Sequence, residues 1–293
     1  MRFTPAWLVV AGMAAAGCSG GEPHGSPVLL SVYWITSAQS AVVWNGADAG
    51  IMTALPAAQE IDFVFDRLLD GSRVEDTVTQ NGVQVPVSKL PPPITVSWPD
   101  AATAMSVPPY ADQVLYNSEP FYGGATAYVL LQPTLPGFPS NDTITFSLDK
   151  TALTSAYGDQ MTGPSQITVM TAPLSVSFRL PSDTTQVPSN YTLPIVFANR
   201  VTGASAVAPF VTATAGGTPL PLSLAADAAD RTVIDASGPS CLGGWPSGIP
   251  ITITVAAGAP DAFGVPLATA ASVTFTSTGG STGACPAGDG GTD

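Results

Sequence analysis

The chain has few of the groups that carry catalysis or bind polyanions. It contains one histidine, and only 8 Lys and Arg stand against 21 Asp and Glu, giving a formal net charge of −13. His24 lies between Pro23 and Gly25, so serine and cysteine hydrolases lack a positioned base and a histidine zinc site is unsupported. The shortage of basic residues argues against nucleic acid as a partner. No cofactor and no metal site are therefore expected.

No apolar run in the sequence reaches transmembrane length, but a short one opens it. Arg2 is followed by apolar residues from Ala6 to Ala16, which is typical of an export signal. The run ends in Ala15-Ala16-Gly17-Cys18, which resembles the lipobox of bacterial lipoproteins. The resemblance implies that residues 1–17 are removed and that Cys18 is acylated. The alternative is an ordinary secretory signal whose cleavage region happens to contain Cys18.

The lipobox resemblance also implies a location. Two or more acyl chains anchor a protein stably without crossing the bilayer, so the membrane is a partner through the lipid. Loss of Arg2 changes the net charge from −13 to −14, which disfavours docking on anionic head groups. Ser19 follows the cysteine where some inner-membrane lipoproteins have aspartate. We therefore expect a bacterial envelope protein, anchored in the outer membrane.

Only three cysteines are present, and one of them, Cys18, is allocated to the lipid. Cys241 and Cys285 remain as an even pair in an oxidising compartment, which favours a disulfide across this 44-residue interval. Two free thiols are the alternative. Metal ligation by two distant cysteines without a nearby histidine is disfavoured.

Strand-like alternation of apolar and polar residues dominates the rest of the chain. Ile144, Phe146 and Leu148 alternate with Thr and Ser, and residues 251–255 repeat this pattern. With 29 glycines and 29 prolines among 293 residues, helical spacing is sparse. The pattern predicts an all-β fold.

The chain also repeats itself. Residues 143–171 parallel residues 250–277, with Tyr157-Gly158 matching Phe263-Gly264. Residues 60–73 parallel 192–205, and residues 29–35 resemble 174–180. A repeat of more than 100 residues indicates tandem domains.

These segments resemble the bacterial immunoglobulin-like modules related to those of S-layer proteins, the SbsA-type family. The resemblance implies two tandem immunoglobulin-like β-sandwiches that act as spacers or binding modules. A fibronectin-type sandwich or a single jelly roll are the alternative folds. The predicted segments are a signal peptide (1–17), a flexible tether (18–26), a sandwich with an insertion (27–173), a second sandwich (174–278) and a Gly-rich acidic tail (279–293).

Aromatic residues in the insertion of the first domain give a candidate binding patch, formed by Tyr110, Tyr116, Phe121 and Tyr122. They either cap the open end of the sandwich or bind a glycan or protein. Trp34, Trp44 and Trp98 lie in strand-like runs and are expected in the core.

Carboxylates are the remaining candidates for chemistry. Asp62 and Asp66 fall on one strand face, which favours a solvated face over a glycosidase pair. Turn aspartates such as Asp66, Asp70, Asp149 and Asp159 could bind calcium, but their spacing does not match an EF-hand.

The sequence therefore favours a non-enzymatic envelope lipoprotein that acts as a spacer or protein-docking module. The alternatives are an adhesin-like or glycan-binding lipoprotein that uses the aromatic insertion, and a carboxylate-dependent hydrolase.

Overall fold

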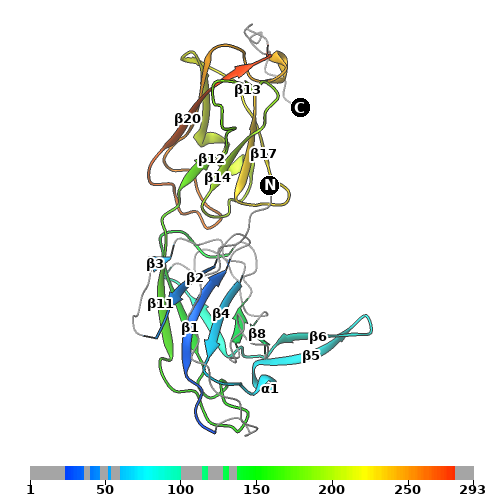
Figure 1. Ribbon diagram of the computed structural model, residues 1–293, viewed down its shortest axis with the longest axis vertical. Helices are drawn as coiled ribbons and strands as arrows, with labels where there is room; N and C mark the ends of the chain where they lie inside the picture. Colours follow the sequence, from blue (N-terminus) through cyan, green and yellow to red (C-terminus); the bar gives the residue numbers. More distant parts are fainter. Residues whose placement is uncertain are drawn as a thin grey trace.

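The computed structural model describes residues 24–35, 40–46, 52–53, 60–99, 114–117, 128–131 and 137–280. These residues form two β-units stacked end to end along the long axis (Figure 1). The helical segments among them are short: α1 (Gly71–Val74), α3 (Ala204–Val207) and the 3-10 turns η2 (Ala208–Phe210) and η3 (Ser240–Leu242). The predicted all-β class is confirmed.

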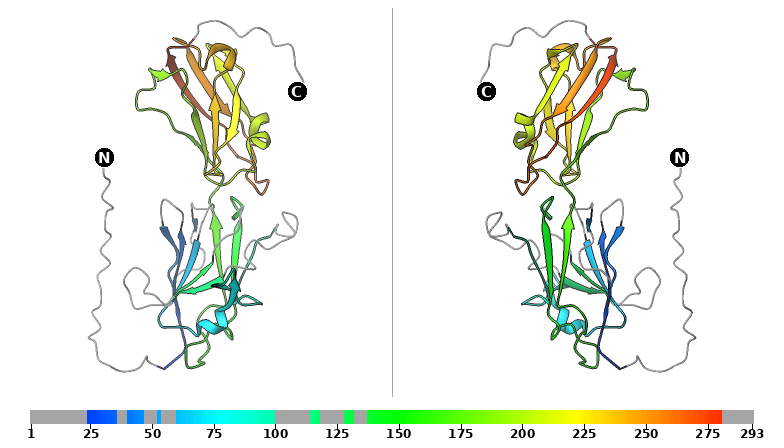
Figure 2. Two further views of the ribbon diagram at one scale, coloured as in Figure 1. Left: turned by 90° about the vertical axis from the view of Figure 1, so that its right-hand side faces the viewer. Right: turned by 90° about the vertical axis from the view of Figure 1, so that its left-hand side faces the viewer.

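The first unit consists of two facing sheets (Figure 2). One has the strand order β2-β1-β4-β9-β8, and the other has the order β3-β11-β10-β7, in which β3 runs parallel to β11. The strands are β1 (Leu29–Ile35), β2 (Ser40–Trp44), β3 (Met52–Thr53), β4 (Glu60–Phe65), β7 (Ile94–Ser97), β8 (Val114–Asn117), β9 (Tyr128–Leu131), β10 (Thr143–Leu148) and β11 (Gln166–Thr171).

The core of the first unit lies between these sheets. In β10 burial alternates residue by residue, as the sequence pattern predicts, and Phe146 meets Phe63 of the opposite sheet edge-on at 5.4 Å between ring centroids. Trp34, Trp44 and Trp98 are all buried, as expected.

The second unit has the same two-layer arrangement around its own core. Its sheets have the orders β12-β14-β18-β17 and β13-β20-β19-β15-β16. The strands are β12 (Val176–Phe178), β13 (Val187–Pro188), β14 (Leu193–Phe197), β15 (Val211–Ala215), β16 (Thr218–Pro219), β17 (Ser223–Ala226), β18 (Val233–Ser237), β19 (Pro250–Val255) and β20 (Ala271–Thr278).

Both units follow one topology. Strands β1, β4, β9 and β8 correspond to β12, β14, β18 and β17, and strands β3, β11, β10 and β7 correspond to β13, β20, β19 and β15. In each unit a two-residue strand pairs in parallel with the last strand. The segments 60–73 and 192–205 supply equivalent strands, β4 and β14. The sequence repeat is therefore a repeat of strand order.

The first unit is larger because of two additions. Strand β2 extends one sheet edge. Between β4 and β7 the chain forms α1 and a hairpin of β5 (Glu75–Gln80) and β6 (Val83–Ser88), whereas the second unit has only α3 and η2 at this point. The chain passes from β11 to β12 through residues 172–175, which include the predicted domain boundary.

The two carboxylates predicted on a solvated strand face differ from that expectation. Asp62 is 1% exposed in β4, the middle strand of its sheet, where both faces are covered. Asp66 lies in the bend after β4 and pairs with Arg67. The prediction of a shared solvated face was wrong because alternation alone does not show that a central strand is covered on both sides.

Candidate functional site

Most of the sequence-predicted site residues lie outside the described residues. These are Cys18, Tyr110, Phe121, Tyr122 and Cys285. Tyr116 falls in β8, where its backbone is in register with Val129 of β9. Cys241 lies in η3 and is disulfide-bonded. Both other cysteines lie outside the described residues, so the pairing of Cys241 with Cys285 stays a prediction.

The turn aspartates have local partners. Asp70 caps α1 by accepting the Ser72 N–H, and Asp149 accepts the N–H and hydroxyl of Thr151. Asp76 pairs with Lys89 at 2.6 Å. Within the described ranges, no group of three metal-ligating side chains occurs. Asp66, Asp70, Asp149 and Asp159, which were considered for calcium, are therefore used in turns, caps and ion pairs, while Asp62 is buried within β4.

Three features of the structure are candidates for function. The first is the junction between the units, formed by buried polar side chains. The Asn199 side-chain amide donates to the Phe138 carbonyl at 2.8 Å and to Asp261 Oδ2 at 3.1 Å. The same carboxylate oxygen accepts the Ser140 N–H at 3.0 Å. Asn199, Ser140 and Asp261 are at most 2% exposed, so these bonds are shielded from water.

An aromatic contact lies at the same junction. Phe263 of the second unit meets Trp98 of the first at 5.9 Å between centroids and 88° between planes. Its side chain packs against the core of the first unit. Residues of the two units thus share one buried boundary, which fixes their relative orientation. Asn199 and Asp261 were missed by sequence reasoning because their burial depends on how the units pack.

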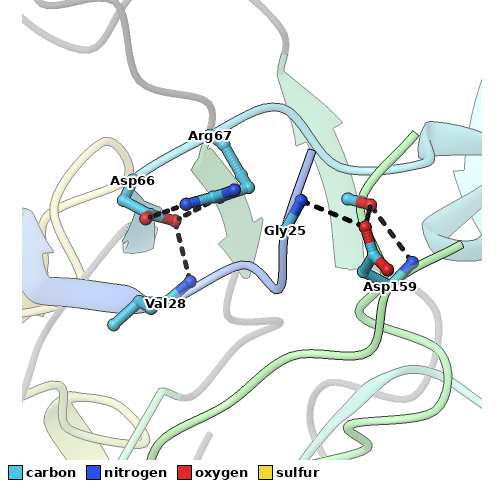
Figure 3. Close-up of polar contacts among 6 residues, drawn as sticks. Gly25, Val28, Asp66, Arg67 and Asp159 are labelled. Carbon is cyan, nitrogen blue, oxygen red and sulfur yellow. Dashed lines mark hydrogen bonds and ion pairs between the residues drawn. The ribbon is translucent and has the colours of Figure 1, made fainter. Parts of the chain in front are cut away.

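The second feature is the base of the first unit, at the end remote from the second unit, where the chain enters β1. At this end Asp66, Arg67 and Asp159 form what we call the base of the first unit. Figure 3 shows these side chains around the residues through which the chain enters β1. Gly25 N–H donates to Asp159 Oδ2 at 3.1 Å, and Val28 N–H donates to Asp66 Oδ1 at 2.8 Å. Gly25 falls inside the predicted tether, so the end of that segment is held by the first unit.

At the base of the first unit, the surroundings of Asp66 favour the ionised form of its carboxyl group. Burial alone would raise the pKa of Asp66, but hydrogen bonds from Arg67 and the Val28 N–H, with the Arg67 charge, hold the pKa below its ordinary value of 3.8. Arg67 reaches Asp66 Oδ2 through Nη2 at 2.8 Å. The base therefore presents a fixed negative oxygen to a backbone donor.

The third feature is the β5–β6 hairpin, which projects sideways from the first unit (Figure 1). Residues opposite each other across the pair share a face, and the pairs Val78–Val85, Asp76–Val87 and Gln80–Val83 place four valines on one face. Val83 is 63% exposed and Val78 is 38% exposed. The hairpin forms a separate two-stranded sheet.

A shallow apolar groove also lies on the second unit. Its volume is about 670 Å³, and Leu220, Leu222 and Leu224 form part of its wall beside α3 and β15. Its lining contains no charged side chain. The groove therefore carries no acid, base or nucleophile pair that could perform catalysis.

No protein-family model and no curated protein matches the sequence. In the part of the chain that the structure describes, no helix is long and apolar enough to span a bilayer.

Proposed function

We propose that the protein is a non-enzymatic envelope lipoprotein whose two units form a rigid spacer that presents a docking arm to another envelope protein. The valine-bearing β5–β6 hairpin carries the docking part of this proposal. A two-stranded hairpin is marginal alone in water, and the valine face of this one keeps Val83 and Val78 exposed. Such a face is stabilised when a partner covers it.

The two strands of the hairpin differ at their outer edges, and β5 is the one suited to pairing with an added strand. Pro86 in β6 lacks an N–H and removes a donor from that strand, as in protected sheet edges. β5 contains no proline, and residues 77–88 contain no charge. An extended segment of a partner protein could pair with β5 and extend the valine face.

The junction supports the spacer part of the proposal. A linker of a few residues allows free movement between domains unless the interface restrains it. Here Asn199, Asp261 and Phe263 join the units through buried hydrogen bonds and a ring contact. Because the connection is rigid, the far end of the second unit keeps a fixed position relative to the anchored end of the first.

Both units are proposed to be immunoglobulin-like sandwiches. Their equivalent strand orders, four strands on one sheet and the last strands on the other, match the arrangement of such domains. The short strands β3 and β13, each parallel to the last strand, support the same assignment.

The test uses the native lipidated protein, cross-linked briefly, extracted in mild detergent and analysed for bound proteins and glycans. The double variant Val78→Thr, Val83→Thr keeps β-branched residues but makes the exposed valine face polar. We expect a stoichiometric protein partner with the native protein and its loss in this variant. The matched control, Thr77→Ala with Gln84→Ala, alters the opposite face and should retain the partner.

Two results would contradict the docking proposal. One is a partner that binds the valine variant as well as the native protein. The other is recovery of glycan without protein, which would support a glycan-binding lipoprotein.

A further inference from the structure

The loops between the last two strands of each unit have the same geometry. In the second unit, Asp261 Oδ1 accepts the N–H groups of Phe263 and Val265, both at 2.9 Å. In the first unit, Ser155 Oγ accepts the N–H groups of Tyr157 and Asp159, both at 3.2 Å. Both acceptors are buried. The two loops are therefore equivalent turns built on different side chains.

In the second unit this loop binds the chain that precedes it. Asp261 uses its second oxygen to accept the Ser140 N–H, and Asn199 donates to the Phe138 carbonyl. The ligand of the loop is thus the backbone of residues 138–140. Asn199 lies two residues after the end of β14.

In the first unit the loop also binds backbone, but from a different position. Ser155 has no second oxygen, but Asp159, four residues on, supplies a carboxylate that accepts the Gly25 N–H (Figure 3). Arg67 lies two residues after the end of β4, the position that Asn199 occupies after β14. In both units the loop supplies a carboxylate, and a polar side chain lies two residues after β4 or β14.

We infer that the base of the first unit is a binding site for backbone, and that its ligand is the protein's own residues 24–28, which precede β1. Five contacts hold this segment: Gly25 N–H to Asp159, Val28 N–H to Asp66, Asp66 N–H to the Val28 carbonyl, Thr162 N–H to the Pro27 carbonyl, and the His24 ring on Tyr157 at 3.9 Å between centroids. At the second unit the counterpart of Val28 is Ser175, since the Asp66 N–H donates to the Val28 carbonyl and the Ala198 N–H donates to the Ser175 carbonyl.

The site selects a glycine in its ligand. Gly25 has φ +141°, and a Cβ there would lie 2.7 Å from Arg67 Nη1. A larger residue would have to displace the guanidinium that pairs with Asp66.

This site sets the distance between the anchor and the rod, a consequence that rests on the proposed lipidation of Cys18. Cys18 and Gly25 are seven Cα–Cα steps apart, and a fully extended chain spans at most about 3.6 Å per step, or roughly 25 Å in all. The base of the first unit is then held close to the membrane surface, with Tyr157, which is 49% exposed, on the same end.

Amide hydrogen exchange measured by NMR on the full-length mature chain with Cys18→Ser tests the site without lipid. We expect the Gly25 and Val28 amides to be protected in this protein. Asp159→Ala should speed exchange at Gly25 at least tenfold, and Asp66→Ala should do the same at Val28. Asp159→Asn keeps an acceptor oxygen and should retain most of the protection.

Asp227→Ala is the matched control, because Asp227 accepts backbone N–H groups within its own turn of the second unit. It should leave Gly25 and Val28 unchanged. Unprotected Gly25 and Val28 amides in the parent protein, or protection unaffected by Asp159→Ala and Asp66→Ala in folded variants, would overturn the inference. Because the chain carries no lipid in this experiment, failure of the lipoprotein proposal would not alter the result.

Discussion

Asp261 illustrates how much of the architecture depends on single polar side chains. Its Oδ1 shapes the loop after β19, and its Oδ2 joins the two units through Ser140 and Asn199. The carboxylate is 2% exposed, so each donor that it satisfies is also removed from water. Loss of such an acceptor leaves several buried donors without a partner.

We therefore expect Asp261→Ala to destabilise the protein by about 1–3 kcal/mol, the usual cost of leaving a buried donor unsatisfied. Urea unfolding followed by tryptophan fluorescence measures the change. Asp183→Ala is the control, because Asp183 makes the same kind of turn with Thr185 in an exposed position. Equal effects of the two substitutions would contradict the role assigned to the buried junction.

The lowered pKa of Asp66 predicts that the stability of the protein depends on pH. Its pKa in the folded protein lies below 3.8, its ordinary value, because of Arg67 and the Val28 N–H. Its ionised form therefore stabilises the fold fully above pH 3.8, and this contribution is lost as pH falls through the lower folded pKa. The stability difference between the native protein and Asp66→Asn should be largest above pH 4 and shrink below it.

Urea unfolding at pH 6 and at pH 3 provides this comparison. Thr185→Ala is a useful control, since it weakens a turn whose Asp183 carboxyl also has a lowered pKa but lies far from the base. A difference between the native protein and Asp66→Asn that is the same at both pH values would show that the Asp66 charge does not contribute.

At the level of elements, the strand pattern was predictable where one face is buried and the other is polar. The alternation in residues 143–148 and 250–255 predicted β10 and β19, because each strand has one side in the core. The β5–β6 hairpin was missed, although Asn81-Gly82 between alternating residues is a strong hairpin signal. Because its two strands bury few side chains, their sequence shows no alternating apolar face of the kind that packs in a core.

The junction could not be predicted for a different reason. Nothing in the local sequence distinguishes Asn199 from a solvated residue after a strand, and its burial arises only when the other unit covers it. One signal was available in the repeat: Gly137-Phe138-Pro139-Ser140 before β10 matches Gly244-Trp245-Pro246-Ser247 before β19. The first copy contributes Phe138 and Ser140 to the junction.

The hairpin turn allows a prediction confined to this element. Asn81 and Gly82 both have positive φ, 53° and 80°, as the tight turn requires. Gly82→Val should unfold the hairpin locally, because a β-branched residue is strained at this φ. Hydrogen exchange should accelerate across residues 75–88, while the global unfolding midpoint stays the same, since no residue of β5 or β6 belongs to either core cluster.

Gln84→Ala is the control within the same hairpin, at an exposed position that needs no positive φ. It should leave exchange across the hairpin nearly unchanged. A fall in the global midpoint on Gly82→Val would indicate that the hairpin is an integral part of the first unit and not an arm.

For the whole molecule, the three cysteines decide between two incompatible arrangements. Cys241 is disulfide-bonded, and its partner is either Cys285 or Cys18. A bond to Cys18 would use the thiol that lipidation requires, whereas a bond to Cys285 leaves Cys18 for the acyl chains. The predicted pairing with Cys285 and the predicted anchor therefore depend on each other.

Peptide mapping by mass spectrometry without reduction identifies the pair directly. We expect a Cys241–Cys285 crosslink, and we expect Cys285→Ser to lower the free energy of unfolding by about 3–4 kcal/mol in the loop-entropy account of a 44-residue closure. Cys241→Ser is the matched variant and should have the same effect, with no further loss in the double variant. A Cys18–Cys241 crosslink would exclude both predictions together.

Lipidation is the property that would turn a two-unit rod into a spacer with a fixed base. Cys18→Ser should move the protein from the membrane fraction to the soluble fraction, because no described helix offers another means of crossing the bilayer and the net charge disfavours head-group binding. Ser19→Ala keeps the cysteine and should leave the protein in the membrane fraction. If Cys18→Ser stays membrane-bound after a high-salt wash, attachment arises elsewhere in the chain. In that case the distance limit between Cys18 and the base of the first unit has no consequence for how the rod stands on the membrane.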